Sequence, residues 1–282
     1  MLLSMEKAIH ITKTCNLKYF KKGAFRRIYW GAEFCQNLIP GVRDTAEALD
    51  FAKRNNLGFT LMTPFIAEDA IKKIENLLEF LCKKVKCEVV LNDWGIAEML
   101  RQRFPGGFMP VLGRLLVRQQ RDPAIENAVR KQPPVLNRLK NGKRMILFHR
   151  LPGREYFDWV RNSYIGSSAM QRILKDFRIG RIELNNVAQG FDFSSWEQAK
   201  SLYTPWVNIS TTRFCPMETL RQKIYRINVC AKECQRQYDL LDTGKITLLK
   251  RGNTLFYFNP VDQARLKGKG VDRLVFQPEP PF

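Results

Sequence analysis

The sequence predicts an α/β protein built as a TIM-like (β/α) barrel, regular or irregular, with a small antiparallel β appendage at its C-terminal end. Strand-like and helix-like stretches alternate over roughly 200 residues, an order typical of a parallel sheet covered by helices. The chain has no Gly-rich phosphate fingerprint and no Walker-type loop, which disfavours the dinucleotide-binding doubly wound folds. About forty residues at the end change character and read as short strands separated by turns.

Apolar spacing and capping residues define the elements of the first half. Apolar residues recur at helical spacing from Ala70 to Leu81, which predicts an amphipathic helix over 68–84. Asp44 and Glu47 have the spacing of a capping box and predict a helix that continues to residue 55. The other expected elements are strands at 27–34, 58–65, 88–91 and 109–113 and a helix at 96–104.

The second half is less regular. Residues 118–142 are polar and basic and contain three prolines, so we interpret them as a loop or insertion with room for one short helix. Ser194 and Glu197 predict a second capping box, opening a helix to Tyr203. The other expected elements are a helix at 168–177 and strands at 144–149, 181–185, 207–210, 245–250, 254–258 and 273–276. This pattern predicts a barrel over 1–243 and the appendage over 244–282.

The composition is that of a globular protein with a strong positive charge. The chain has 282 residues, of which 45% are apolar, enough for one large domain. No apolar stretch is long enough to span a bilayer, and the N-terminus lacks the layout of a signal peptide, so we expect a cytoplasmic protein.

The formal charge of +20 indicates attraction to an anionic partner, although a solvated basic surface without a specific partner is the simpler alternative. RNA is one candidate partner, because basic residues concentrate in the middle of the chain. They are Arg114, Arg118, Arg121, Arg130, Lys131, Arg138, Lys140, Lys143, Arg144, Arg150 and Arg154. Aromatic residues are not interleaved there, which disfavours sequence-specific reading of single strands.

Four of the seven cysteines form the candidate metal site: Cys35, Cys215, Cys230 and Cys234. In a reducing compartment clustered cysteines indicate metal rather than disulfides, and four thiolates suit an iron–sulfur cluster or a structural zinc ion. We favour the cluster, because zinc sites usually come as two close C-x2-C pairs and here one ligand lies far upstream. On a helix, Cys230 and Cys234 would share one face.

The remaining cysteines, Cys15, Cys82 and Cys87, we interpret as structural thiols. Basic residues surround the last three ligand candidates and could offset the negative charge of a cluster, or simply extend the basic surface. They are Arg213, Arg221, Lys223, Arg226 and Lys232.

Polar residues fall at the expected ends of strands, where barrel enzymes carry their chemistry. Asp93, Arg114 and Glu183 are the candidate catalytic residues, in the role of orienting a substrate. The alternative is that such residues are ordinary loop and cap residues, which end many strands.

Several motifs together resemble the collagenase-like peptidase family of uncertain mechanism, in its UbiU/UbiV-like branch. They are Gly31-Ala32-Glu33-Phe34-Cys35, Asn92-Asp93-Trp94-Gly95, Thr211-Thr212-Arg213-Phe214-Cys215-Pro216 and the Cys230-x3-Cys234 pair, the last giving a UbiV-like cysteine layout. The resemblance covers roughly residues 25–260. It implies a TIM-like barrel with a [4Fe-4S] cluster on the four cysteines, acting beside a second related barrel in oxygen-independent hydroxylation, as in quinone synthesis.

Two other functions stay open. Other relatives in this family hydroxylate RNA bases, which agrees with an RNA-binding or RNA-modifying role for a basic chain. A protease is a remote alternative, because the peptidase signature of the family is not found around Cys215.

Overall fold

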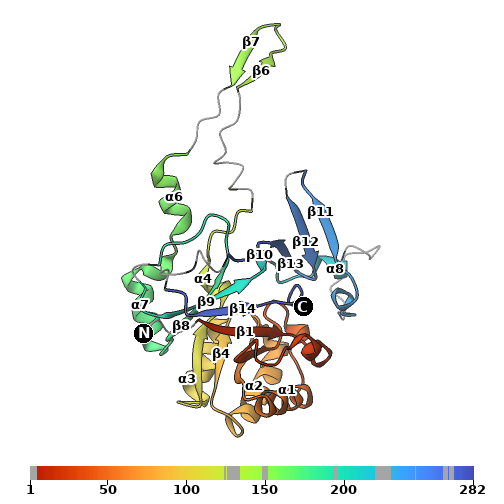
Figure 1. Cartoon of the computed structure of the whole chain (residues 1–282), viewed down its shortest axis with the longest axis vertical. Coiled ribbons are helices and arrows are strands. Elements are labelled where there is room, and N and C mark those ends of the chain that lie inside the picture. Colours follow the sequence, from red (N-terminus) through yellow and green to blue (C-terminus); the bar gives the residue numbers. More distant parts are fainter. Residues whose placement is uncertain are drawn as a thin grey trace.

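Eight parallel strands form a closed barrel in the order β1, β14, β9, β8, β5, β4, β3, β2 in this computed structural model (Figure 1). The structure describes residues 5–123, 125, 134–147, 152–193, 196–219, 230–244, 246–262, 266 and 270–282. The barrel strands are β1 (Glu6–Ile11), β2 (Arg27–Trp30), β3 (Gly58–Met62), β4 (Cys87–Leu91), β5 (Phe108–Leu112), β8 (Arg181–Asn185), β9 (Ala199–Thr204) and β14 (Arg273–Phe276). The predicted α/β barrel class is therefore confirmed.

Helices follow most of the barrel strands and cover their outer surface (Figure 1). The α-helices are α1 (Val42–Arg54), α2 (Glu68–Cys82), α3 (Trp94–Arg103), α4 (Arg114–Val117), α6 (Arg154–Arg161), α7 (Ser168–Asp176) and α8 (Pro216–Thr219). Four short 3-10 helices are η1 (Thr14–Tyr19), η2 (Gln36–Leu38), η3 (Tyr164–Gly166) and η4 (Glu233–Gln235). Of the apolar residues that predicted α2, Ile71 is exposed, whereas Ala70, Ile74, Leu77, Leu78 and Leu81 are buried. None of the helices within the described residues has the length and apolarity needed to cross a membrane.

A second, antiparallel sheet is inserted between the last two barrel strands in the chain. Its order is β10-β13-β12-β11, with β10 (Trp206–Thr211), β11 (Asp239–Asp242), β12 (Thr247–Arg251) and β13 (Thr254–Phe258). This confirms an antiparallel sheet in the C-terminal part of the chain. The strands β10 and β11 precede residue 244, and β14, which follows it, returns to the barrel.

A β-hairpin lies apart from both sheets. β6 (Val135–Arg138) pairs only with β7 (Arg144–Leu147), and the hairpin projects away from the barrel (Figure 1). It occupies part of the segment expected to be a loop, and the expected strand at 144–149 is its second arm. Residues 148 and 149 lie outside the described part of the chain.

Three expectations about elements are wrong. The helix expected to run to Tyr203 is instead strand β9, because both edges of that strand hydrogen-bond to neighbouring strands, β8 on one side and β14 on the other. Helix α1 begins at Val42, and its N-cap is Gly41, three residues before the expected cap at Asp44. The sequence analysis also missed β1, which supplies the strand between β2 and β14.

The interior of the barrel is layered from floor to mouth, since alternate residues of each strand face inward. A middle layer is apolar and consists of Ala8, Tyr29, Met62, Val90, Val111, Tyr203 and Val275. The floor, at the N-terminal ends of the strands, is charged. The mouth, at their C-terminal ends, is polar and lies beneath the antiparallel sheet, because the Asn208 amide of β10 donates to Asn185 at the end of β8 (3.4 Å).

Candidate functional site

Four cysteines from three segments of the chain lie at one side of the barrel mouth. Cys35 follows β2 and precedes η2, whereas Cys215 lies between β10 and α8. Cys230 precedes η4 and Cys234 lies within it, so no helix joins these two residues and the expected helical face is wrong. Cys234 is buried and the other three are partly buried, and none of the four forms a disulfide.

Cys35 interacts electrostatically with the other three cysteines, and Cys234 interacts with Cys215 and Cys230. The pKa of the Cys35 thiol is raised to about 11, chiefly by burial, while a backbone hydrogen bond at Asn37 lowers it and the charges of Cys234, Cys230 and Cys215 raise it further. The pKa of Cys234 is likewise raised by burial and then by Cys215 and Cys230. We call these four residues the cysteine quartet.

The turn between β12 and β13 ties the segments of the quartet together. The Arg251 guanidinium donates to the carbonyl of Cys234 (2.8 Å) and to that of Pro280 (2.9 Å). The Asn253 amide donates to the carbonyls of Phe34 (2.9 Å) and Thr212 (2.6 Å). Arg251 and Asn253 are both buried, so this turn fixes the backbone next to three of the four cysteines.

Glycine is required in the middle of this turn. Gly252 has a φ of +57°, and a Cβ there would lie 2.4 Å from the Phe282 ring. Phe282 stacks on Phe34 at 6.1 Å and meets Phe256 edge-on at 6.0 Å, and Cys35, Cys215 and Cys234 pack against this aromatic cluster. The cysteine quartet therefore lies on an apolar, close-packed base.

Beside the quartet, a buried ion pair holds the barrel mouth. Arg114 begins α4, directly after β5, and bonds both carboxylate oxygens of Glu33, with both side chains wholly buried. The same guanidinium donates to the Asn185 Oδ1 (2.9 Å) and lies 3.9 Å from the centre of the Tyr203 ring. Arg114 is thus fully engaged in fixing Glu33, two residues before Cys35.

The other two candidate catalytic residues lie elsewhere. Asp93 is the N-cap of α3, where its carboxylate accepts from the backbone amides of Gly95 (2.7 Å) and Ile66 (3.2 Å). It therefore has the role of a cap residue, the alternative to a catalytic role. Glu183 lies inside the barrel below the mouth, where it accepts from the Tyr29 hydroxyl at 3.0 Å. The structure therefore does not bring Asp93, Arg114 and Glu183 into one site.

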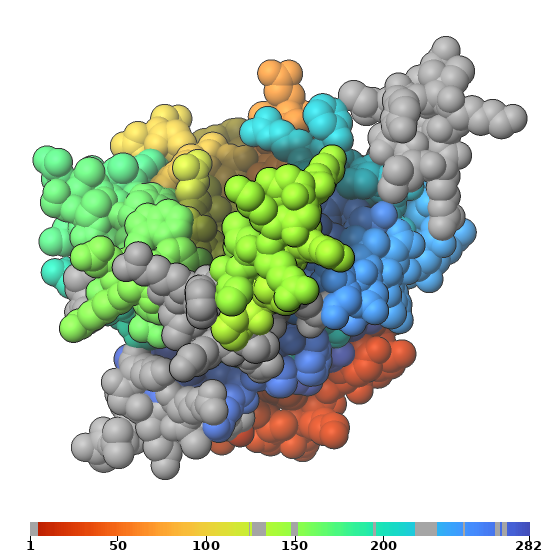
Figure 2. Space-filling model, turned by 90° about the horizontal axis from the view of Figure 1, so that it is seen from above, coloured from red at the N-terminus to blue at the C-terminus, as the bar shows by residue number. Residues whose placement is uncertain are grey.

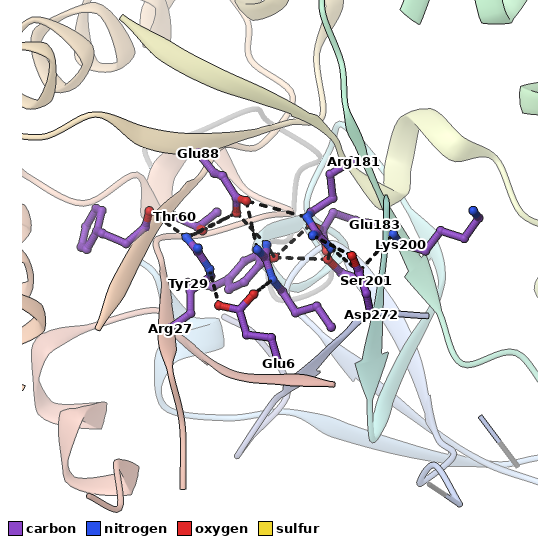
Figure 3. Close-up of polar contacts among 12 residues, drawn as sticks. Glu6, Arg27, Tyr29, Thr60, Glu88, Arg181, Glu183, Lys200, Ser201 and Asp272 are labelled. Atoms are coloured by element: carbon purple, nitrogen blue, oxygen red, sulfur yellow. Dashed lines mark hydrogen bonds and ion pairs between the residues drawn. The ribbon is translucent and has the colours of Figure 1, made fainter. Parts of the chain in front are cut away.

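Glu183 belongs to a charged network at the barrel floor (Figure 3). Arg273 binds both oxygens of Glu88 (2.6 and 3.0 Å) and donates to the Tyr29 hydroxyl (2.7 Å). The whole floor network consists of Glu6, Arg27, Tyr29, Thr60, Glu88, Arg181, Glu183, Ser201, Asp272 and Arg273.

The charges of the floor network balance when Glu183 is protonated. Burial raises the pKa of Glu183 to about 7, against the opposing effect of Arg273 and Arg181. Its Oε2 has no hydrogen-bond partner among the described residues, although the side chain is wholly buried. A neutral Glu183 leaves three arginines facing three carboxylates, so the network needs no further counter-ion.

The chemistry of the cysteine quartet fits a metal–sulfur group, since it gathers four cysteines outside any disulfide, three of which pack on an apolar base. Within the described part of the chain, no three His, Cys, Asp or Glu side chains are grouped so as to enclose one metal ion. Of the basic residues expected around the quartet, Arg213 and Lys232 are exposed, whereas Arg221, Lys223 and Arg226 lie outside the described residues.

The sequence analysis missed Arg251 and Asn253, which read only as turn residues between two strands. The charge of Arg251 lowers the pKa of Cys234. The sequence analysis expected basic residues nearer in sequence to offset negative charge at this place. No signal in the sequence shows that this turn folds back across the quartet.

The fold and the site define a parallel α/β barrel with a cysteine-rich mouth beneath an antiparallel sheet. No protein-family model and no curated protein matches the chain. Among solved structures, it is similar to that of the U32 peptidase Mk0906, with a TM-score of 0.46 and 11% sequence identity, over 99% of this chain and 95% of that chain.

Proposed function

We propose that the protein carries a [4Fe-4S] cluster on Cys35, Cys215, Cys230 and Cys234 and serves in an oxygen-independent hydroxylation beside a second, related barrel protein. The single observation that carries the proposal is the grouping of four cysteines, none of them in a disulfide, at the barrel mouth. When bound, the cluster would supply electron transfer or the activation of an oxygen donor.

A cluster of this kind suits the spacing better than zinc. Zinc–sulfur bonds of about 2.3 Å in a tetrahedron would hold four sulfurs only about 3.8 Å apart around one ion. A four-iron cluster binds one thiolate to each iron and therefore takes a wider ring of sulfurs.

The surrounding residues have definite tasks in this proposal. Arg114 holds Glu33 and so fixes the backbone that leads to Cys35. Arg251 places a buried positive charge next to Cys234, which favours the thiolate and offsets the negative charge of a cluster. The aromatic cluster of Phe34, Phe256 and Phe282 excludes water from one side.

Iron analysis tests this proposal directly. Protein purified without oxygen is expected to contain about four irons and four acid-labile sulfides per chain, with a broad absorption band at the blue end of the visible spectrum. Cys215→Ala and Cys230→Ala are each expected to lose most of the iron and the colour, because each removes a ligand that no neighbouring group replaces.

Two cysteines outside the quartet provide the matched controls. Cys15 and Cys82 are exposed, so Cys15→Ala and Cys82→Ala are expected to keep the full iron content. If the Cys215 and Cys230 variants also keep it, or if the native protein contains zinc, the cluster proposal is wrong.

A second candidate function, RNA binding, is favoured by the β6–β7 hairpin. Residues 135–147 contain four cations and no acidic residue, and every side chain of the two strands is exposed. The hairpin stands over one face of the molecule when the protein is viewed from above (Figure 2, lime). A projecting basic ribbon is suited to contact phosphates.

Charge removal in the hairpin tests this second candidate. Replacing Arg138, Lys140, Lys143 and Arg144 by Gln is expected to weaken RNA binding at low salt. The slope of log K against log salt should fall by about 3 in magnitude if all four contact phosphates of a single strand. Fluorescence anisotropy with a labelled RNA measures both quantities.

The matched control removes four exposed cations from the opposite end of the molecule, on α1 and α2: Arg43, Lys53, Arg54 and Lys73. This variant has the same net charge as the hairpin variant. Equal loss of affinity in both would mean that net charge alone attracts RNA, and the hairpin would have no specific role.

A further inference from the structure

The barrel mouth contains buried polar atoms without partners. Among the described residues, the Asn185 Nδ2, both side-chain atoms of Asn208 and the Arg121 Nη1 have no hydrogen-bond partner. Asn185 and Asn208 are wholly buried. Buried polar groups are normally hydrogen-bonded, so several unpartnered atoms in one region indicate that another group completes them.

These three residues lie around one point, the end of β8. Asn208 donates its backbone amide to the Asn185 Oδ1. Gln119, two residues before Arg121, exchanges hydrogen bonds with the backbone amide and carbonyl of Asn185 (2.7 and 3.4 Å). This double contact brings the chain at Arg121 to the same strand end.

The orientation of the Asn185 amide is fixed. Its Oδ1 accepts from the Arg114 guanidinium at 2.9 Å and from the Asn208 amide at 3.4 Å, both of which are donors only. The Nδ2 therefore points away from Arg114 and remains a donor. The Asn208 side chain has no such constraint and can also turn its Nδ2 toward the same point.

Arg121 carries a charge that its surroundings do not balance. The pKa of Arg121 is lowered to about 10, chiefly by burial and also by the neighbouring Arg114, whereas Glu33 and Tyr257 oppose this shift. Glu33 is already bonded through both oxygens to Arg114. Among the described residues, no other carboxylate offsets the positive charge of Arg121. The side-chain amide donors of Asn185 and Asn208 also lack an acceptor.

We propose that Arg121, Asn185 and Asn208 bind a carboxylate or phosphate group of a small-molecule ligand at the barrel mouth. Guanidinium and amide N–H groups are donors, so their complement is an acceptor-rich anion, and Arg121 supplies its counter-charge. The site lies at the C-terminal ends of the strands, where barrel proteins bind their substrates.

The inference deepens the proposed function, because Arg114 joins Asn185 of this site to Glu33 beside the cysteine quartet. The test of the anion site needs no bound cluster, so the anion-site proposal and the cluster proposal can fail separately. Iron content decides the cluster, whereas anion binding decides this site.

Isothermal titration of the purified protein at low ionic strength, with inorganic phosphate in one arm and succinate in the other, tests the site. One anion is expected to bind per chain, and the arm with the tighter binding identifies the headgroup. Arg121→Gln is expected to weaken binding by about tenfold or more, as for loss of a charged hydrogen-bond partner. Arg118→Gln, the same change at an exposed position three residues earlier, is expected to leave binding unchanged.

A second variant keeps the proposal testable if Arg121→Gln does not fold. Asn208→Asp places a carboxylate permanently beside Arg121. It is expected to raise the melting temperature of the anion-free protein and to abolish binding of both probes, since the site then contains its own anion.

Three results would overturn the inference. The first is that neither probe binds to the native protein. The second is that Arg118→Gln weakens binding as much as Arg121→Gln, which would indicate non-specific attraction to the basic surface. The third is that Asn208→Asp lowers the melting temperature and leaves binding intact.

Discussion

Replacing Arg114 by Met is expected to lower the free energy of unfolding by about 3–5 kcal/mol, the range for removing one partner of a buried ion pair. Arg114 and Glu33 are both wholly buried, and both Glu33 oxygens bond to the guanidinium. The variant leaves a carboxylate in the interior without its counter-charge. Urea unfolding followed by circular dichroism measures the loss.

Arg101 provides a matched comparison. It also bonds both oxygens of a glutamate, Glu98, but the pair is exposed on α3. Arg101→Met is therefore expected to change stability little, since exposed ion pairs are screened by water. Adding Glu33→Gln to Arg114→Met is expected to recover part of the stability, because a neutral amide replaces the unpaired charge. A loss in Arg114→Met no larger than in Arg101→Met would contradict this account.

Replacing Glu183 by Gln is expected to stabilise the protein at pH 8 by up to about 3 kcal/mol and to have little effect near pH 5. The pKa of Glu183 is raised in the fold from 4.5 to about 7. Between these two values the unfolded chain has released the proton that the folded protein retains, so stability falls as the pH rises and the cost remains above pH 7. Glutamine mimics the protonated acid and avoids this cost.

Urea unfolding at several pH values measures the effect. Glu47→Gln makes the same chemical change on an exposed face of α1 and controls for the loss of one negative charge. A gain from Glu183→Gln that is equal at pH 5 and pH 8, or a loss at pH 8, would show that Glu183 is ionised in the folded protein.

The class of fold could be predicted because it depends on local pattern. Helix α2 shows the 3.6-residue period, β4 is a short and largely apolar run, and β8 alternates polar and apolar residues. Strand β9 was mistaken for a helix because its sequence follows a plausible cap. Only hydrogen bonds to β8 and β14, which the local sequence does not show, make it a strand.

The candidate site was less predictable, because its contacts join distant residues. The choice of cysteines rested on residue type, and the structure brings those four together. The turn at Arg251–Asn253 acts across more than 200 residues, since Asn253 bonds the carbonyl of Phe34. A turn sequence contains no information about a partner at that distance.

The floor network shows the same limit. Three charged residues of this network lie in short strands: Arg27, Glu88 and Arg273. From the local sequence alone, each would be expected to face solvent. Closure of the sheet into a barrel turns these positions inward, where Arg273 meets Glu88 from the other side of the barrel. Such polar layers become visible only when strand register is known.

The position of β14 affects how the protein can be made. β14 lies between β1 and β9, so the first and last strands of the barrel are neighbours. During translation the other seven strands emerge first and can form only an open sheet, with β1 and β9 as unpaired edges. Pairing of Ala8 with Val275 then joins segments nearly a whole chain length apart, a contact that forms slowly. The nascent chain therefore exposes two unpaired edges until β14 has been synthesised, a period in which chaperones would protect it from aggregation.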